Sequence, residues 1–285
     1  MDTASSHDQG SNVDDQVVRD FGLEWSRYRQ AHLSEADHLA MFEDYFSLFP
    51  WDKLPLGARG FDMGCGSGRW AQLVAPRVGE LICVDPSEAA LQVARSNLAS
   101  FTNCSFHCAS ANDWASEMGS MDFGYSLGVL HHVPDTFEAL RACVAHLRPG
   151  APFLLYLYFA FDNKPRWYQQ LWKASDAVRR RVCGMPQAVK VPVCALIAGF
   201  IYWPLSRLAG LCERLGYDVD TFPLSYYRNK SLYVLLTDSL DRFGTRLERR
   251  FTRQEIAELM HAAGLADIQF SRRRPYWCAL GFRRI

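Results

Sequence analysis

The 285-residue sequence has no excess charge of either sign, because 31 Lys and Arg residues balance 31 Asp and Glu residues. Nucleic-acid binding depends on a cationic surface, so this balance disfavours a DNA or RNA partner. The nine cysteines include no C-x-x-C pair, and Cys104 and Cys108 have no His or Cys partners at zinc-finger spacing. We therefore expect no metal site, and we interpret the cysteines as reduced, buried thiols.

The N-terminus lacks the basic start and the apolar run of a secretory signal peptide, since residues 1–15 are polar and acidic. We expect a disordered tail there and a cytoplasmic protein. Long apolar runs are scarce as well. The most apolar stretch, residues 191–205, is interrupted by Pro192 and Pro204 and falls short of the roughly 20 apolar residues that a spanning helix needs. It predicts either a buried or lid helix or a contact with a membrane surface.

Hydrophobic periodicity divides the rest of the chain into regions. After the tail at 1–15, helical spacing of apolar residues predicts a helical cap over 16–54. Strands then alternate with helices over 55–160, which is typical of a parallel sheet with helices on both faces. The alternation stops over 161–250, where we predict a helical insertion on the substrate side, and it resumes over 251–285 with a closing helix and two strands. Aromatic residues are dense in the cap and over much of the insertion, where they either pack the core or form an apolar ligand surface.

Seven segments are predicted as strands of one doubly wound, mostly parallel α/β sheet, with the insertion after the fifth strand. These segments are residues 61–63, 81–84, 104–108, 121–127, 152–159, 267–271 and 277–282. Ser87, Asp135 and Thr252 occupy positions that are typical of helix N-caps, and Glu255 completes a capping box with Thr252.

Residues 61–68, Phe-Asp-Met-Gly-Cys-Gly-Ser-Gly, connect the first predicted strand to a helix. Glycines in such a turn permit positive φ angles and let the backbone approach a ligand. The third glycine comes one residue earlier than in the G-x-G-x-x-G dinucleotide fingerprint. Asp62 would attract a cationic ligand and repel a pyrophosphate, while Asp85, at the end of the next strand, is placed to accept hydrogen bonds from ribose hydroxyls. The pattern favours a nucleoside cofactor that carries a sulfonium and an amino acid tail.

The chain resembles the class I, Rossmann-like S-adenosylmethionine-dependent methyltransferases, in particular the branch called methyltransferase type 11. Four stretches carry the resemblance: residues 61–68, Val84–Ser87, Met121–Asp135 with its run Ser-Leu-Gly-Val-Leu-His-His-Val-Pro-Asp, and Leu147–Gly150. The resemblance covers residues 55–160 and, more weakly, 251–285, whereas residues 161–250 match no motif of the family. It implies the seven-stranded fold of these enzymes and S-adenosyl-L-methionine as the cofactor.

The resemblance also implies roles for individual residues. The three glycines of the loop would line the methionyl part of the cofactor, with Asp62 near its amino group and Asp85 near its ribose. Trp25 and Tyr28, on one face of the N-terminal helix, either cover the methionyl carboxylate or pack this helix on the sheet. The full implied set is Trp25, Tyr28, Asp62, Gly64, Gly66, Gly68, Asp85, Pro86, Ala111, Asn112, Asp113, Leu127 and Gly128, in which residues 111–113 would lie by the adenine. Ser110 departs from the family, where an acid is common.

His131 and His132 follow the fourth strand, at the sheet edge where ligands bind in open α/β folds. They either remove a proton from the methyl acceptor or only shape the loop over the cofactor. With Tyr158, near the end of the fifth strand, they are the candidate catalytic residues. Asp238 and Asp241 fall in a polar patch that we interpret as a solvated helix face.

The apolar, aromatic insertion favours a small hydrophobic or aromatic acceptor, such as an isoprenoid, a quinone-like ring, a lipid-linked compound or a natural-product scaffold, methylated by direct displacement. An activated sugar stays open as an acceptor, and so does the oligomeric state. The alternatives to a methyltransferase are a nicotinamide-dependent oxidoreductase, which the glycine spacing disfavours, and a non-catalytic relative that keeps the fold.

Overall fold

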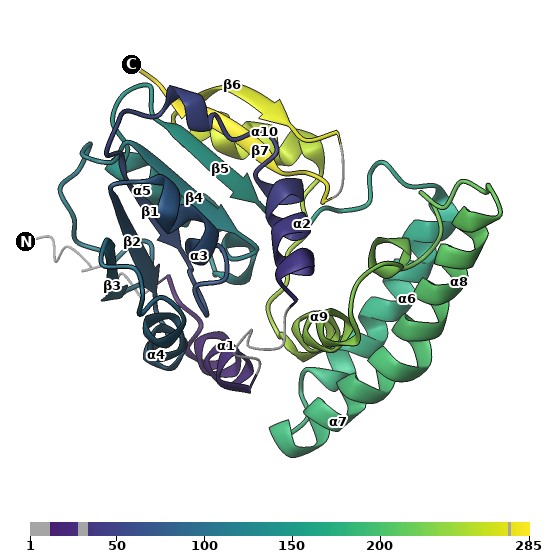
Figure 1. The fold of residues 1–285 in the computed structure, drawn as a ribbon. Helices are drawn as coiled ribbons and strands as arrows, with labels where there is room; N and C mark the ends of the chain where they lie inside the picture. Colours follow the sequence, from purple (N-terminus) through teal and green to yellow (C-terminus); the bar gives the residue numbers. More distant parts are fainter. Residues whose placement is uncertain (1–11, 28–33, 273–274) are drawn as a thin grey trace, which may run out of the picture.

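A computed structural model of the chain describes residues 12–27, 34–272 and 275–285. A sheet of seven strands forms the centre of the larger body, and a group of long helices extends to one side of it (Figure 1). The strands are β1 (Arg59–Met63), β2 (Glu80–Asp85), β3 (Cys104–Cys108), β4 (Phe123–Leu127), β5 (Pro152–Tyr156), β6 (Leu265–Phe270) and β7 (Ala279–Arg283).

The strand order in the sheet is β3-β2-β1-β4-β5-β7-β6. The first five strands run parallel, and β7 is antiparallel to both of its neighbours, β5 and β6. The predicted doubly wound, mostly parallel sheet is confirmed. Because the chain order reverses between β1 and β4, the carboxyl ends of these neighbouring strands form the crevice in which such sheets bind ligands.

Strand β2 illustrates how the sheet is buried on both faces. Leu81 and Cys83 belong to one hydrophobic core, which includes aromatic side chains of the N-terminal cap. Ile82 and Val84 belong to the other core, which lies against the helices that follow β4 and precede β6. Successive side chains of a strand point to opposite faces, so a strand covered on both sides is apolar throughout.

Four helices flank the sheet: α3 (Ala71–Val74), α4 (Glu88–Asn97), α5 (Thr136–His146) and α10 (Arg253–Ala262). The predicted caps are confirmed, since the side chains of Ser87 and Asp135 accept hydrogen bonds from the first turns of α4 and α5, and Thr252 and Glu255 form the capping box of α10. The helix expected after the glycine loop is only one turn, α3, followed by a 3-10 turn at Ala75–Arg77. Pro76 lacks the N–H that an α-helix would need at this point.

The N-terminal cap consists of α1 (Asp15–Arg27) and α2 (Glu35–Tyr45). Ordered structure begins earlier than the predicted tail allows, because the Asn12 amide donates hydrogen bonds to the Asn112 side chain (2.9 Å) and to the Asp135 carbonyl (2.8 Å). The rest of the predicted tail, residues 1–11, lies outside the described residues. Helix α1 lies close to the start of α4, where a Cβ atom on Gly22 would be 2.6 Å from the Ser87 hydroxyl.

The insertion is helical, as predicted. It contains α6 (Arg166–Val182), α7 (Gln187–Ile197), a π-helical turn (Ala198–Tyr202), α8 (Trp203–Arg214) and α9 (Leu232–Gly244). The two prolines were expected to interrupt the apolar stretch, and this expectation was wrong. The segments α7, the π turn and α8 form one continuous helix over Gln187–Arg214. The wider π turn ends at Tyr202, two residues before Pro204, and such a turn accommodates a residue that cannot complete the α-helical hydrogen-bond ladder. Within the described part of the chain, this helix alone is long and apolar enough to cross a membrane.

Candidate functional site

A cavity of about 700 Å³ lies at the carboxyl ends of β1, β2 and β4. Its floor is the crevice where the strand order reverses, α1 covers one part of it, and the helices of the insertion enclose the rest. The cavity is thus composed of two parts, one at the glycine loop and one between the sheet and the insertion.

The glycine loop after β1 requires its glycines for two reasons. Gly64 and Gly66 have φ angles of 77° and 53°, in the region that residues with a Cβ rarely adopt. A Cβ atom on Gly64 would clash with Val129, and one on Gly66 would lie 2.9 Å from the Trp25 indole nitrogen. The Trp25 side chain therefore packs directly over the loop from α1, which agrees with both predicted roles of this residue.

Asp85 connects the end of β2 to the glycine loop. Its carboxylate accepts hydrogen bonds from the Gly66 N–H and from the Ser87 N–H, both at 2.9 Å. Burial raises the pKa of Asp85 to about 6, although these two hydrogen bonds act in the opposite direction. A carboxylate accepts more than two hydrogen bonds, so Asp85 retains acceptor capacity toward the cavity that it lines.

Asp62 lies at the end of β1, behind the glycine loop, and is only 1% exposed. One of its oxygens, Oδ2, has no hydrogen-bond partner among the described residues. Burial raises the pKa of Asp62 to about 8, and the nearby Tyr125 hydroxyl acts in the opposite direction. The carboxyl group is therefore mostly protonated near neutral pH, and a cation placed beside it would favour its ionisation.

Helix α1 closes the cavity over the glycine loop with Val17, Phe21 and Trp25. The helix is tied to the insertion by a buried ion pair between Lys190 Nζ and Asp20 Oδ2 at 3.1 Å. Tyr28, predicted to act with Trp25, lies outside the described residues.

The other predicted cofactor residues divide into two groups. Pro86, Leu127 and Gly128 line the cavity, as do Trp25, Gly64, Gly66 and Asp85. Asp62 and Gly68 do not line it: Asp62 lies behind the loop, and Gly68 packs against Leu98. Residues 111–113 do not line the cavity either. Ala111 is part of the core, the Asn112 side chain pairs with Asn12, and Asp113 accepts a hydrogen bond from Ser110 Oγ at 2.6 Å. Their predicted contact with an adenine ring stays a prediction.

Like Tyr158, the candidate catalytic residue His132 lines the cavity. Its Nδ1 lies 2.6 Å from the Leu247 carbonyl oxygen, which only accepts hydrogen bonds, so we assign the ring proton to Nδ1. The other nitrogen, Nε2, has no hydrogen-bond partner in the described part of the chain and lies 3.9 Å from Asp241 Oδ1. Burial lowers the pKa of His132, and the nearby Asp241 carboxylate partly opposes this shift. The neutral ring therefore offers a free basic nitrogen.

Asp241, on α9, is not on the solvated face that the sequence suggested. Its side chain is mostly buried and lines the cavity, because α9 packs against α1, α6 and α7 and brings Asp241 beside His132. The Tyr158 hydroxyl donates a hydrogen bond to Asp241 Oδ2, while Asp241 Oδ1 has no hydrogen-bond partner in the residues described. Burial raises the pKa of the Asp241 carboxyl group, and the His132 ring acts against this shift.

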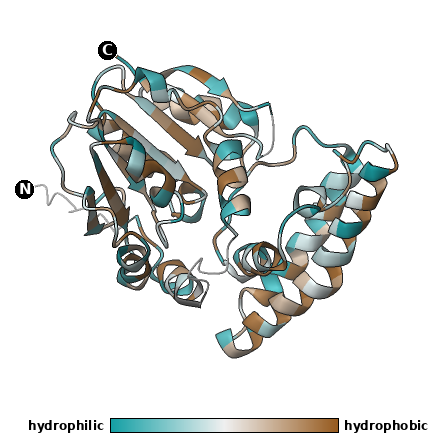
Figure 2. Ribbon diagram, viewed as in Figure 1, coloured by the Kyte–Doolittle hydropathy of each residue, from teal (hydrophilic) through white to brown (hydrophobic). Residues whose placement is uncertain are grey.

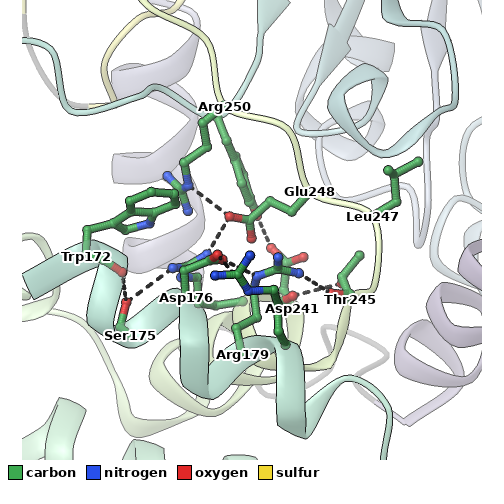
Figure 3. A network of polar contacts seen from close by, with 12 residues as sticks. Trp172, Ser175, Asp176, Arg179, Asp241, Thr245, Leu247, Glu248 and Arg250 are labelled. Carbon is green, nitrogen blue, oxygen red and sulfur yellow. Dashed lines mark hydrogen bonds and ion pairs between the residues drawn. The ribbon is translucent and has the colours of Figure 1, made fainter. Parts of the chain in front are cut away.

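An ionic network of the insertion surrounds Asp241 (Figure 3). Glu248 accepts hydrogen bonds from Arg242 and from Arg250, the latter at 2.8 Å. The Arg250 guanidinium lies 5.1 Å from the centre of the Tyr158 ring. These contacts restrict Tyr158 from one side, so that its hydroxyl is held toward Asp241.

His131 differs from its neighbour. Its ring is fully buried, does not line the cavity, and packs between His132 and Tyr158 with ring centres 3.9 Å from each. Of the two roles that the sequence left open, this geometry supports the structural one, because a ring beneath the cavity wall cannot touch an acceptor.

Sequence reasoning missed several charged residues of the cavity, among them Arg69, Asp241 and Asp238, the last of which also lines the cavity instead of a solvated face. Arg69 directly follows the glycine loop, and its guanidinium lies over the Trp70 ring, 4.6 Å from the centre. It lowers the pKa of Asp62, in part offsetting burial. Position next to the loop could have identified Arg69, and the spacing of Asp238 and Asp241 on one helical face could have suggested that both point the same way.

The central part of the chain is similar in sequence to known methyltransferases. Residues 61–150 match the family model described as a methyltransferase domain. A ubiquinone biosynthesis O-methyltransferase of Xanthomonas axonopodis pv. citri is 34% identical over 103 residues, which are 35% of this chain and 43% of that protein. The enzyme of the same name from Idiomarina loihiensis is 29% identical over 160 residues, 53% of this chain and 63% of that one. The chain thus spans less than two thirds of either relative.

Solved structures support the fold alone, because their sequence identity is low. A Thermotoga maritima structure, described as an S-adenosylmethionine-dependent methyltransferase and possible histamine N-methyltransferase, has a TM-score of 0.50 at 16% identity and covers 94% of this chain and 99% of that one. A Haloferax volcanii methyltransferase, solved with its Trm112 activator, has a TM-score of 0.50 at 13% identity and covers 93% and 98%.

Proposed function

Because residues 61–150 form a class I, S-adenosylmethionine-dependent methyltransferase domain, we propose that the chain methylates a hydroxyl group of a small, hydrophobic acceptor held in the cavity. The observation that carries this proposal is the pair formed by His132 Nε2 and Asp241 Oδ1. Both atoms are buried against the cavity without a hydrogen-bond partner in the described structure, and they lie 3.9 Å apart. Buried acceptors without partners are costly, so the pair is suited to a ligand that donates a hydrogen bond.

The residues at the glycine loop fit the cofactor. Gly64 and Gly66 line the part of the cavity where its methionyl part would lie, and Asp85 can accept from its ribose hydroxyls. The unpartnered oxygen of Asp62 suits the cationic amino group. When bound, S-adenosyl-L-methionine supplies a methyl group that its sulfonium makes electrophilic.

The residues of this chain would orient the acceptor and remove its proton. A hydroxyl that donates to His132 Nε2 can transfer its proton to this nitrogen, since Nδ1 already carries one and is held by the Leu247 carbonyl. The Asp241 carboxylate lies close enough to stabilise the imidazolium that forms. Tyr158 holds the carboxylate in place through its hydrogen bond.

The wall of the cavity supports an apolar acceptor. Its part between the sheet and the insertion is lined by aromatic and aliphatic side chains, among them Tyr156, Trp172, Leu205, Tyr227 and Phe243. Aromatic walls bind flat rings through their faces and edges. The names of the curated relatives, ubiquinone biosynthesis O-methyltransferases, favour a quinone-like ring with a free hydroxyl. Such compounds are poorly soluble in water, so they would be available at a membrane surface, which residues 191–205 are predicted to contact.

Turnover of a phenol with a short isoprenoid tail, with labelled S-adenosyl-L-methionine, tests the proposal. We expect His132→Gln to lower kcat by about 10²- to 10⁴-fold, the usual contribution of a positioned base. The affinity of the His132→Gln variant for S-adenosylhomocysteine should equal that of the wild type. His107→Gln is the matched control, because His107 is exposed on β3 and does not line the cavity. Full turnover by the His132→Gln variant would exclude the proposed base.

A further inference from the structure

The continuous helix over Gln187–Arg214 has one packed face and one bare face. Side chains at spacings of three and four, including Cys194, Ala198 and Ser206, are buried against the rest of the insertion. On other faces the helix exposes large apolar side chains, most of all Phe200, which is 77% exposed, with Leu196 and Trp203 beside it in the helical repeat. Only 22% of the most apolar 18-residue window is buried. Hydrophobic residues recur along α7 and α8 in Figure 2.

Helix α6 adds to this exposed apolar surface with Trp167, Leu171 and Val178. Single exposed apolar residues are ordinary on a soluble protein, but rows of large ones on neighbouring elements mark an interaction surface. We call residues 166–214 the helical arm. Its exposed tryptophans are of the type that is enriched where proteins meet the interface of a bilayer.

The charge of the helical arm differs from that of the whole chain. Residues 166–214 contain eight Lys and Arg residues and only two acids, Asp176 and Glu213, a net charge of +6 in a chain whose net charge is zero. Arg166, Lys173 and Arg181 are exposed and form no ion pair within the described structure. A surface that is both apolar and cationic is complementary to a bilayer with anionic lipids.

The cavity opens on the same surface. Leu171 and Val178 of α6 and Ile201 of the π turn all line the cavity, and each is also about half-exposed to solvent. The mouth of the cavity is therefore bordered by apolar side chains that continue onto the exposed face of the arm. An apolar molecule that reaches this border would enter the cavity along apolar side chains.

Polar contacts at several points hold the long helix against the domain. Lys190 pairs with Asp20 of α1 and donates to the Gly244 carbonyl at 3.1 Å. In α8, Arg207 donates to the carbonyls of Arg228 (2.6 Å) and Lys230 (2.9 Å). A helix tied down in this way is suited to the plane of a membrane surface rather than to a path across the bilayer.

We propose that the helical arm docks on an anionic lipid bilayer, with Phe200, Leu196 and Trp203 inserted among the lipids, and that the cavity receives its acceptor from this bilayer. The second half of this inference rests on the proposed function, whereas the docking itself does not.

Flotation with lipid vesicles tests the docking. The full chain should bind vesicles of phosphatidylcholine with phosphatidylglycerol, bind vesicles of phosphatidylcholine alone far more weakly, and dissociate as salt is added. Phe200→Glu should weaken binding by about tenfold or more, since it replaces an inserted apolar side chain by a charge. Neutralising Lys173 or Arg181 with Gln should weaken it by about fivefold each. Leu56→Glu, at a fully exposed apolar position outside the arm, is the control and should bind as the wild type does.

Two results would overturn the docking. One is a wild-type chain that binds neither kind of vesicle, and the other is equal loss of binding in Phe200→Glu and Leu56→Glu. If sedimentation shows a dimer that Phe200→Glu separates, while vesicles do not bind, the face joins two copies of the chain and the inference is wrong.

A second measurement separates this inference from the proposed function. Turnover of an acceptor embedded in the anionic vesicles should fall in Phe200→Glu, while turnover of the dissolved short-tailed phenol stays at the wild-type level, because Phe200 does not line the cavity. Equal turnover of the embedded acceptor by both proteins would overturn delivery from the bilayer. Absence of turnover in every format, with vesicle binding intact, would contradict the proposed function and leave the docking standing.

Discussion

Replacement of Asp62 by asparagine tests the electrostatics of the cofactor site. Burial raises the pKa of Asp62 to about 8, so only about a tenth of the molecules carry the ionised carboxylate at pH 7. If the amino group of the cofactor pairs with the ionised form, binding must release a proton, which costs about 1.4 kcal/mol at pH 7. The wild-type affinity for S-adenosylhomocysteine should therefore rise up to about tenfold per pH unit below pH 8 and level off above it.

The asparagine side chain of the Asp62→Asn variant has the shape of the acid but no proton to release. We expect the binding affinity of this variant not to depend on pH in this range. Its binding free energy should be weaker by about 1.5–3 kcal/mol than that of the wild type above pH 8, because a hydrogen bond to a charged group is lost. Calorimetric titrations between pH 6 and pH 8.5, in buffers with different ionisation enthalpies, measure both the affinity and the protons released. Equal pH slopes for Asp62→Asn and the wild type would refute the assignment of Asp62 to the cofactor.

The same pKa shift predicts an effect on stability without any ligand. The pKa of Asp62 in the folded protein lies above its ordinary value of 3.8, so the stability contributed by the protonated, buried carboxyl group is lost as the pH rises toward 8. Asp62→Asn keeps a neutral side chain at every pH. Its thermal unfolding midpoint should exceed that of the wild type by a margin that widens from pH 5 to pH 8, and a constant margin would contradict the shift.

Three further substitutions test the site and its cover. Asp85→Ala should weaken cofactor binding by about 1–3 kcal/mol in calorimetry, because hydrogen bonds to a carboxylate are lost, and unchanged affinity would exclude the ribose contact. Gly66→Ala places a Cβ atom 2.9 Å from the Trp25 indole nitrogen at a φ of 53°. Calorimetry should therefore show weaker cofactor binding even at temperatures where the variant is fully folded. Lys190→Met leaves the Asp20 carboxylate without its buried partner and should destabilise the protein by about 3–5 kcal/mol in denaturant unfolding, with partial recovery in the double variant Asp20→Asn/Lys190→Met.

The sequence predicted those parts of the molecule whose signals are local. Continuous apolar runs revealed the strands, since side chains on both faces of a covered parallel strand are buried. The caps Ser87, Asp135 and Thr252 lie at the first turns of their helices because each side chain bonds to N–H groups two or three residues later. The glycine loop was recognisable for the same reason, as its backbone angles depend on the residues of the loop itself.

The parts that the sequence did not predict depend on contacts between distant segments. His132 meets the Leu247 carbonyl 115 residues away, and Tyr158 meets Asp241 83 residues away. Such pairs follow from how α9 packs against α1 and the other helices of the insertion, which no local spacing encodes. The continuous helix through Pro204 was missed for a different reason: a π turn absorbs the missing hydrogen bond, and propensity rules for α-helices do not anticipate one.

The central claim is that the pair formed by His132 and Asp241 deprotonates a hydroxyl for methylation in the cavity. The most direct measurement is transfer of a labelled methyl group from S-adenosyl-L-methionine to the short-tailed phenol by the wild type and by Asp241→Asn, with S-adenosylhomocysteine affinity measured in parallel. The account predicts label in the ether product of the wild type, a large loss of kcat in Asp241→Asn, and equal cofactor affinity. Cofactor binding without methyl transfer by the wild type to this phenol, or equal turnover by both proteins, would contradict it.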